Sequence, residues 1–196
     1  MLPGFGSFAV YFYHLFKTAQ GHAAIAWNER GISSFRLPAS TQEETKRSLL
    51  RRLPDAVETP PSDAAVRVVE AAQRYFAGEQ VDFSQVAIDM GAQDPLFARI
   101  YQVVRGLGWG ETTTYGEVAK ALGEGPEVAR DVGQAMARNP IPLIVPCHRV
   151  LAAGRKIGGF SAPGGSDAKA RMLALEGVRP HADAPTKPSA QTSFAF

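Results

Sequence analysis

The chain has 196 residues, of which 45% are hydrophobic and 20% are charged, and its formal net charge is +2. This composition is typical of a globular protein that buries one core, or two small cores packed together. No apolar run approaches the roughly 18 residues that a membrane span requires, so we expect no membrane partner.

Cysteine and histidine usage narrows the chemistry. Cys147 is the only cysteine, which excludes an intramolecular disulfide and any multi-cysteine metal site. The four histidines lack metal-ligand spacing, and we predict no metal and no cofactor. A free thiol fits a reducing compartment, so we expect a cytoplasmic protein.

Charge is unevenly distributed along the chain. Residues 96–180 hold eleven basic and seven acidic residues, a balance of +4, and the remainder holds ten and twelve, a balance of −2. A basic second half suits an anionic partner, although a solvated surface explains the charge equally well.

The first half predicts a small α/β unit. The apolar amino-terminal segment lacks a positive region and a cleavage site, so we interpret it as part of the fold rather than as an export signal. Residues 23–37 form two apolar runs around Asn28–Gly31, which predicts a hairpin. A capping-box pattern at Ser40–Glu44 predicts a short helix toward Leu53.

Two further elements complete this half. Apolar residues at helical spacing over residues 65–76 predict a helix that ends before Gly78. Residues 81–88 are expected to form a strand. We see no catalytic constellation before residue 93, and we assign residues 1–92 to an amino-terminal α/β domain.

The second half begins with a helix and a pair of shorter ones. Asp94-Pro95 combines a preferred N-cap with a proline at the first helical position. Helices over 115–122 and 126–138, joined by the turn Gly123–Gly125, would have the shape of a helix-turn-helix. That shape is also common in proteins that never touch DNA.

Beyond these helices, an apolar run bracketed by Pro140 and Pro146 predicts an irregular or edge strand that ends at Cys147. A last helix is expected over 167–176, and residues 180–196 are rich in proline and polar residues, which predicts a disordered tail. The expected fold is therefore α/β (α+β), with the amino-terminal domain packed on a mostly helical carboxy-terminal domain, residues 93–179.

A lone cysteine is more often a small buried hydrophobe than a nucleophile. A free thiol is only slightly ionised at neutral pH, so a nucleophilic cysteine needs a base or a cation nearby. His148 and Arg149 supply both types of group next to Cys147. Neighbouring side chains on a strand point to opposite sides, so His148 can serve Cys147 only if the chain turns there or a water bridges them.

Pro146-Cys147-His148-Arg149-Val150, preceded by Asn139-Pro140, resembles the acceptor motif of the O6-alkylguanine-DNA alkyltransferases. The resemblance extends from about residue 113 to residue 176, and the first half resembles the family's variable amino-terminal domain more weakly. It implies stoichiometric transfer of the alkyl group from O6 of guanine to Cys147, after base flipping from a minor-groove-bound helix-turn-helix. The implied partner is double-stranded DNA bound by a monomer, and repair of O4-alkylthymine stays open.

The resemblance also implies catalytic roles. Cys147 would attack the carbon attached to O6, and His148 would deprotonate the thiol through a water. Glu176 would orient His148, as in other nucleophile–base–orienter relays. Tyr115 resembles the tyrosine that crowds the target's phosphate and donates a hydrogen bond to the flipped base.

DNA contacts are implied for the second helix of the pair. Arg130 resembles the arginine finger that fills the gap in the base stack. Ala129 and Gly133 are small enough for a close approach to a minor groove, although packing in the core is an alternative for the nearby Ala135. Arg138 would contact a phosphate or simply be a solvated surface arginine.

Substrate contacts are implied for four positions. Asn139 resembles the hinge between the recognition helix and the active-site segment. Ser161 and the backbone of Val150 resemble groups that hold the guanine. Phe160 stands where a tyrosine is common, so a hydroxyl is absent there.

Three other functions are weaker alternatives. A DNA-binding module like the alkyltransferase-like proteins would lack the acceptor cysteine, which this chain has. A helix-turn-helix regulator would leave the motif around Cys147 unexplained. A cysteine hydrolase would need another histidine and an oxyanion hole, and we identify neither.

Overall fold

The first half of the chain forms a small sheet with two helices. The structure is a computed structural model that describes residues 10–180. Its first elements are β1 (Phe12–Thr18), β2 (Gly21–Asn28), β3 (Gly31–Ala39), α1 (Gln42–Leu50), β4 (Val57–Glu58) and α2 (Asp63–Phe76). The strand order is β3-β2-β1-β4, and only β4 runs parallel to its neighbour. The hairpin and both predicted helices of this half are confirmed.

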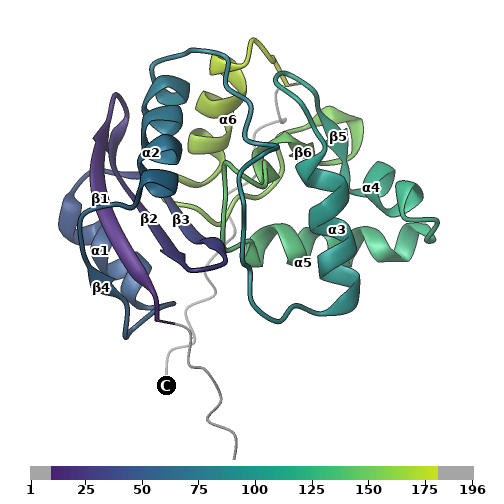
Figure 1. The fold of residues 1–196 in the computed structure, drawn as a ribbon. Coiled ribbons are helices and arrows are strands. Elements are labelled where there is room, and N and C mark those ends of the chain that lie inside the picture. Colours follow the sequence, from purple (N-terminus) through teal and green to yellow (C-terminus); the bar gives the residue numbers. More distant parts are fainter. Residues whose placement is uncertain (1–9, 181–196) are drawn as a thin grey trace, which may run out of the picture.

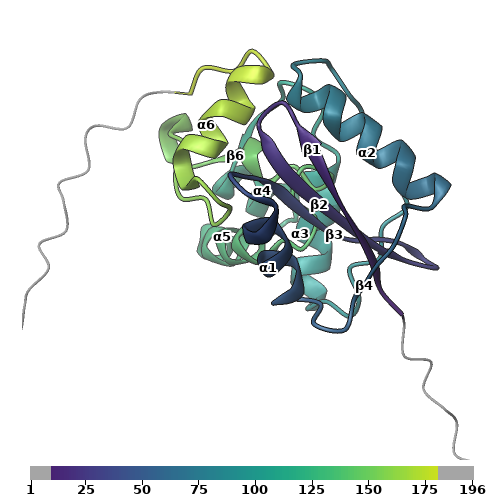
Figure 2. The same ribbon diagram turned by 90° about the vertical axis from the view of Figure 1, so that its left-hand side faces the viewer.

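Side chains of β1 and β2 alternate between two apolar layers. Phe16 and Ile25 belong to a cluster with α2, whereas Tyr13 and Ala24 belong to a cluster with Leu49 of α1. Because successive residues of a strand point to opposite faces, each helix covers one face of the sheet. Figure 2 shows α1 and α2 on the two sides of the strands.

The second half is mostly helical. Its elements are α3 (Pro95–Arg105), β5 (Thr113–Thr114), α4 (Tyr115–Ala121), the 3-10 turn Pro126–Val128, α5 (Ala129–Arg138), the 3-10 turn Cys147–Arg149, β6 (Val150–Leu151), the 3-10 turn Ala153–Arg155 and α6 (Gly165–Leu175). The Asp94 side chain accepts hydrogen bonds from the first-turn amides of α3, as its N-cap position predicts. β5 and β6 form a short parallel pair.

α3, α4 and α5 lie together, away from the four-stranded sheet (Figure 1). Thr114 and Glu117 form a reciprocal capping box that sets where α4 begins. Gly123 follows α4 with a φ of +75°, a left-handed conformation that favours glycine. Residues 126–128 form a 3-10 turn rather than the predicted first turn of α5.

The predicted strand over residues 81–88 is wrong, because polar side chains hold the chain in a turn. Asp82 accepts hydrogen bonds from both the backbone amide and the hydroxyl of Ser84, at 2.8 and 2.9 Å. Such local bonds compete with an extended strand. Only Ile88 forms an isolated bridge, with Ile32 of β3.

The predicted strand before Cys147 is also wrong. Leu143 has a φ of +79°, and the amide of Val145 donates to the carbonyl of Ile141 at 2.9 Å, so the segment folds into a buried turn. The Pro140 carbonyl accepts a hydrogen bond from the Phe35 amide of β3. The prolines supply no amide for a ladder, which explains why no regular strand forms.

Two large apolar clusters form the core. One joins the sheet and α2 but also includes Ile141, Leu143, Ile144 and Met172, from beyond the predicted boundary at residue 92. The other joins α3, α4 and α5 and includes Cys147 and Val150. The predicted tail lies outside the described residues, except for Pro180. The observed fold is a mixed α+β fold.

Candidate active site

Cys147 lies where the buried turn ends and a 3-10 turn begins. Its amide donates to the Val145 carbonyl at 2.8 Å, and its side chain is buried in the helical core. The chain therefore turns at Cys147, but this turn does not bring the Cys147 and His148 side chains into the same core. The turn sends the next side chain, His148, to the opposite core, where it is fully buried.

Glu176, the C-cap residue of α6, is the centre of a buried hydrogen-bond network. Its Oε1 accepts from Nε2 of His148 at 2.7 Å and from the Tyr75 hydroxyl at 2.8 Å. Arg149 donates to both carboxylate oxygens, Nε to Oε2 at 2.8 Å and Nη2 to Oε1 at 3.0 Å. The Gly110 amide donates to Oε2 at 3.1 Å. The network joins α2, α6 and the segment that carries Cys147.

These bonds determine the charge states. Burial alone would raise the pKa of Glu176, but the hydrogen bonds from His148 and Arg149 outweigh it and hold this pKa at about 2. Burial lowers the pKa of His148 in spite of Glu176, so the imidazole is neutral at pH 7. Nε2 then donates to Glu176, which leaves Nδ1 as the acceptor nitrogen. Nδ1 is buried and has no hydrogen-bond partner within residues 10–180.

The thiol itself is not activated by its surroundings. Burial raises the pKa of Cys147, and a hydrogen bond with Asn139 and the charge of Lys169 only oppose this effect. The resting group is therefore a thiol, and a base is needed to generate the thiolate nucleophile. Asn139 is itself fixed, because its amide donates to the Val145 carbonyl at 2.8 Å and its oxygen accepts from the Ile141 amide at 3.0 Å.

A pocket of about 330 Å³ opens beside Cys147. Tyr115, Phe160 and Ser161, all candidates from the sequence, line it together with Cys147 and Gly133. The volume and the mixed lining suit a planar heterocyclic base. Ser161 uses its hydroxyl to donate to the Ala137 carbonyl at 3.0 Å, which attaches the loop after Phe160 to the end of α5.

Lys169 is a site residue that sequence reasoning missed. It is completely buried in α6, and its Nζ donates to the Val150 carbonyl at 2.6 Å. The same Nζ lies 5.8 Å from the ring centre of Tyr115 and 5.9 Å from that of Phe160. Burial lowers the pKa of Lys169 to about 8. Lys169 lies in the polar first half of α6, where the sequence predicts only a solvated side chain.

Tyr75 was also missed as a site residue, since its helical spacing indicated a core position and nothing more. It is fully buried, and besides Glu176 its hydroxyl lies 3.2 Å from Nε2 of His148. The Trp109 ring packs edge-on against it at 5.5 Å.

Of the proposed DNA-contacting residues, Tyr115 and Gly133 line the pocket, whereas Ala129, Arg130 and Arg138 lie outside it on α5. Arg130, in the first turn of α5, is exposed, and Ala129 is half-buried beside it. Arg138, in the last turn, is exposed and stacks on Phe97 at 5.7 Å. Ala135 is fully buried in the helical core, which confirms the alternative prediction that it packs there rather than against DNA.

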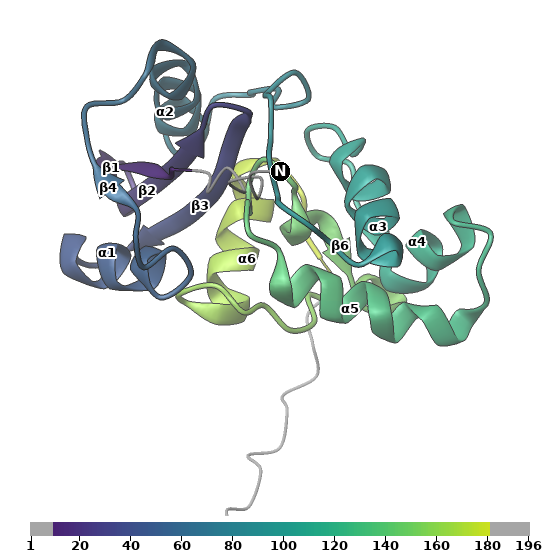
Figure 3. The ribbon, with the colours of Figure 1, turned by 60° about the horizontal axis from the view of Figure 1, so that its bottom comes forward.

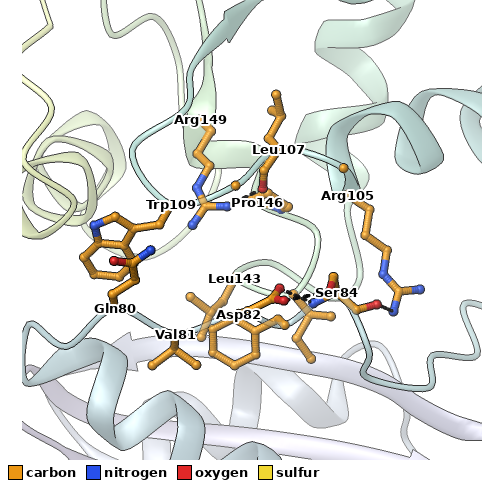
Figure 4. Close-up of a pocket in the computed structure, with 14 residues that line it drawn as sticks. Gln80, Val81, Asp82, Ser84, Arg105, Leu107, Trp109, Leu143, Pro146 and Arg149 are labelled. Atoms are coloured by element: carbon orange, nitrogen blue, oxygen red, sulfur yellow. Dashed lines mark hydrogen bonds between the residues drawn. The ribbon is translucent and has the colours of Figure 1, made fainter.

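A further cavity, of about 400 Å³, lies behind the Cys147 segment, between the two halves of the chain. Figure 4 shows Arg149, Pro146 and Trp109 on one side of it, and Val81, Asp82 and Leu143 on the other. Arg149 borders it while donating to Glu176 and to the Leu107 carbonyl. The Arg149 side chain therefore links Glu176 to the segment after α3.

Known proteins share both the sequence pattern and the fold. Residues 95–178 match the family described as the DNA-binding domain of 6-O-methylguanine DNA methyltransferase. The methylated-DNA–protein-cysteine methyltransferase of Mycobacterium tuberculosis (strain H37Rv) is 34% identical over 166 residues, which are 85% of this chain and 88% of that protein. A DNA base-flipping protein of Thermus thermophilus is 40% identical over 114 residues, covering 58% and 74%.

Solved structures agree with these relatives. A crystal structure of M. tuberculosis OGT in complex with DNA superimposes with a TM-score of 0.69 at 30% identity, covering 84% of this chain and 92% of that one. The O6-methylguanine-DNA methyltransferase of Pyrococcus kodakaraensis gives a TM-score of 0.64 at 25% identity, covering 85% and 100%. Within residues 10–180, no helix has both the length and the apolar character needed to cross a membrane.

Proposed function

Because the chain belongs to the family of methylated-DNA–protein-cysteine methyltransferases and is a DNA-repair methyltransferase, we propose that Cys147 is its alkyl acceptor. The observation that carries this assignment is the position of Cys147, which borders a base-sized pocket and is followed directly by a histidine bonded to a buried carboxylate. The reaction is direct transfer from O6 of guanine in DNA.

The proposed chemistry starts from a neutral His148. Its free Nδ1 removes the thiol proton of Cys147 through one water, and the charge that develops on the ring is stabilised by Glu176 at 2.7 Å. The thiolate attacks the alkyl carbon, an S–C bond forms, and the electron pair of the broken C–O bond goes to O6. Tyr115 borders the pocket and donates a hydrogen bond to the departing base. The thioether product has no leaving group, so each chain reacts once.

The guanine is held in the proposed site by the loop after β6. Ser161 and Phe160 border the pocket, and Phe160 contributes its ring where no hydroxyl is available. Val150 does not line this pocket, and its carbonyl accepts a hydrogen bond from Lys169. Asn139 fixes the turn that presents Cys147.

We propose that α4 and α5 act as the helix-turn-helix and that α5 enters the minor groove. Gly133 supports this, because a Cβ there would meet no atom within 4 Å, so packing does not require a glycine that costs about 1 kcal/mol in a helix. Ala129 is similarly small, Arg130 is free to enter the base stack, and Arg138 is placed to reach a phosphate.

The division at residue 92, the assignment of residues 93–179 to the alkyltransferase domain, and the monomeric state stay predictions. The shared core cluster supports close packing of the two domains rather than independent units. Size-exclusion chromatography with light scattering tests the monomer, and one chain per particle is the expected result.

Intact-mass measurement after incubation with duplex DNA containing methyl-labelled O6-methylguanine tests the assignment. We expect one methyl per chain, mapped to Cys147, and no transfer in Cys147→Ser. Repeated turnover by one chain, or DNA binding with no transfer, would contradict the proposal. Because Cys147 is the only cysteine, the Cys147→Ser variant is a complete control for thiol chemistry.

A further inference from the structure

A second cavity, of about 190 Å³, also borders Cys147. We call this cavity the side pocket. It is lined by β3, by α1 and the residues after it, by the end of α5, and by the loop after Phe160. Figure 3 shows that α1 and α5 both lie on the side of the molecule that is turned toward the viewer. The side pocket extends from the buried Cys147 to the exposed residues Arg52 and Arg138.

The side pocket is positively charged. Arg36, Arg52 and Arg138 line it, and its lining contains no aspartate or glutamate. None of the three arginines forms an ion pair within residues 10–180. The Nε of Arg36 is buried without a hydrogen-bond partner in the same part of the chain.

The like charges of these arginines repel one another. Burial, together with the nearby charges of Arg52 and Arg51, lowers the pKa of Arg36 to about 10. Buried guanidinium groups are normally paired with carboxylates or phosphates. An anion in the side pocket would supply the missing partner.

The geometry of the transfer reaction determines which part of the substrate can enter the side pocket. Sulfur, the attacked carbon and O6 lie in line, so any substituent on that carbon must project sideways from the line. We call the pocket of about 330 Å³ beside Cys147 the base pocket. It shares five lining residues with the side pocket: Met136, Ala137, Cys147, Phe160 and Ser161. With the guanine in the base pocket, the side pocket is the space available for the substituent.

We propose that the side pocket selects a negatively charged substituent on the transferred carbon, so that a carboxymethyl group is preferred over its neutral isostere. This inference rests on the proposed function. The Cys147–CH₂ bond forms, the CH₂–O6 bond breaks with its electron pair on O6, the thiol proton leaves through His148, and the carboxylate passes unchanged to the protein. Arg36 and Arg52 are specificity residues and do not touch the reacting atoms.

Single-turnover transfer from three duplexes tests the preference. They carry O6-methylguanine, O6-carboxymethylguanine or the neutral isostere O6-carbamoylmethylguanine in one sequence. We expect carboxymethyl to be transferred about tenfold faster than carbamoylmethyl, the size of one charge-assisted hydrogen bond. Arg36→Met and Arg52→Met should bring this ratio toward one and leave the methyl rate within about twofold, and Arg52→Glu should reverse it.

Arg67→Met is the matched control, since it removes an exposed arginine of α2 away from the side pocket and should keep the wild-type ratio. Equal rates for the two isosteres in the wild type would overturn the inference. An equal loss on all three duplexes in the arginine variants would also overturn it, because the arginines would then act on the DNA backbone. Absence of methyl transfer by the wild type would instead overturn the proposed function.

Discussion

At the scale of single residues, Glu176 shows how a buried charge becomes tolerable. It receives bonds from the side chains of Tyr75, His148 and Arg149 and from the Gly110 amide. Each of these donors would be costly to bury unpaired, so the carboxylate and its donors depend on one another. A network of this kind fixes the orientation of His148 more rigidly than a single bond would.

Glu176→Gln tests this dependence. We expect the free energy of unfolding to fall by about 3–5 kcal/mol, because the Arg149 guanidinium stays buried without its counter-charge. Urea denaturation measures the loss. The control is Glu79→Gln, which breaks the exposed Arg74–Glu79 pair and should cost less than about 1 kcal/mol. Equal losses in the two variants would show that burial of the network contributes nothing.

His148→Ala tests the base. The pKa of His148 is lowered, so the neutral base persists as the pH falls through 6.5, and the wild-type transfer rate should decline only below that value. The pKa of Cys147 is raised, so without the base the thiol ionises only at alkaline pH. The variant should be about 10²–10⁴-fold slower at pH 7 and should accelerate as the pH rises. A variant with the wild-type pH profile would assign His148 a purely structural role.

At the scale of elements, α4 and α5 are positioned by local signals and by shared burial. The Thr114–Glu117 capping box starts α4 at Tyr115, which brings that side chain to the rim of the base pocket. Val132, Ala135 and Met136 bury one side of α5 in the helical core, and the arginines at its ends remain exposed. One face of α5 therefore packs while the other is free to contact DNA.

Arg130→Ala tests the role of α5. Loss of the inserted side chain should slow transfer from duplex DNA by about tenfold or more, because part of the cost of base flipping is no longer offset. Transfer from free O6-benzylguanine, which needs no flipping, should be unchanged. The two rates are measured by intact mass in parallel. A similar loss on both substrates would exclude the finger role.

At the scale of the whole molecule, the network at Glu176 joins segments from both halves and links stability to pH. The pKa of Glu176 is about 2 in the folded chain, below its ordinary value of 4.5. A lowered carboxyl pKa means that the unfolded chain binds the proton more tightly. The stabilisation is therefore complete above about pH 4.5 and is lost as the pH falls from there to about 2.

Urea titrations at pH 6 and pH 3 measure this loss. The wild type should lose more unfolding free energy between the two pH values than Glu176→Gln does, because the glutamine has no proton to bind. The excess should approach a few kcal/mol at the lowest pH. The same pH dependence in both proteins would mean that other carboxylates cause the acid sensitivity.

Local signals in the sequence were enough to predict several elements and to indicate the family. Asp94-Pro95 starts α3, the turn at Asn28–Gly31 closes a hairpin, and both follow from interactions within a few residues. The pentapeptide around Cys147 indicated the family, because the residues of this motif are adjacent in the chain.

Tertiary structure alone decided what surrounds these residues. Tyr75 and Glu176 are 101 residues apart, and no local period encodes their hydrogen bond. Lys169 is buried only because Val150, Tyr115 and Phe160 enclose it. The apolar runs before Cys147 and after Gly78 are turns, because the Val145 amide bonds back to the Ile141 carbonyl and Ser84 bonds back to the Asp82 side chain. Burial and long-range pairing depend on which segments meet in space, whereas periodicity reports only which face of an element is apolar.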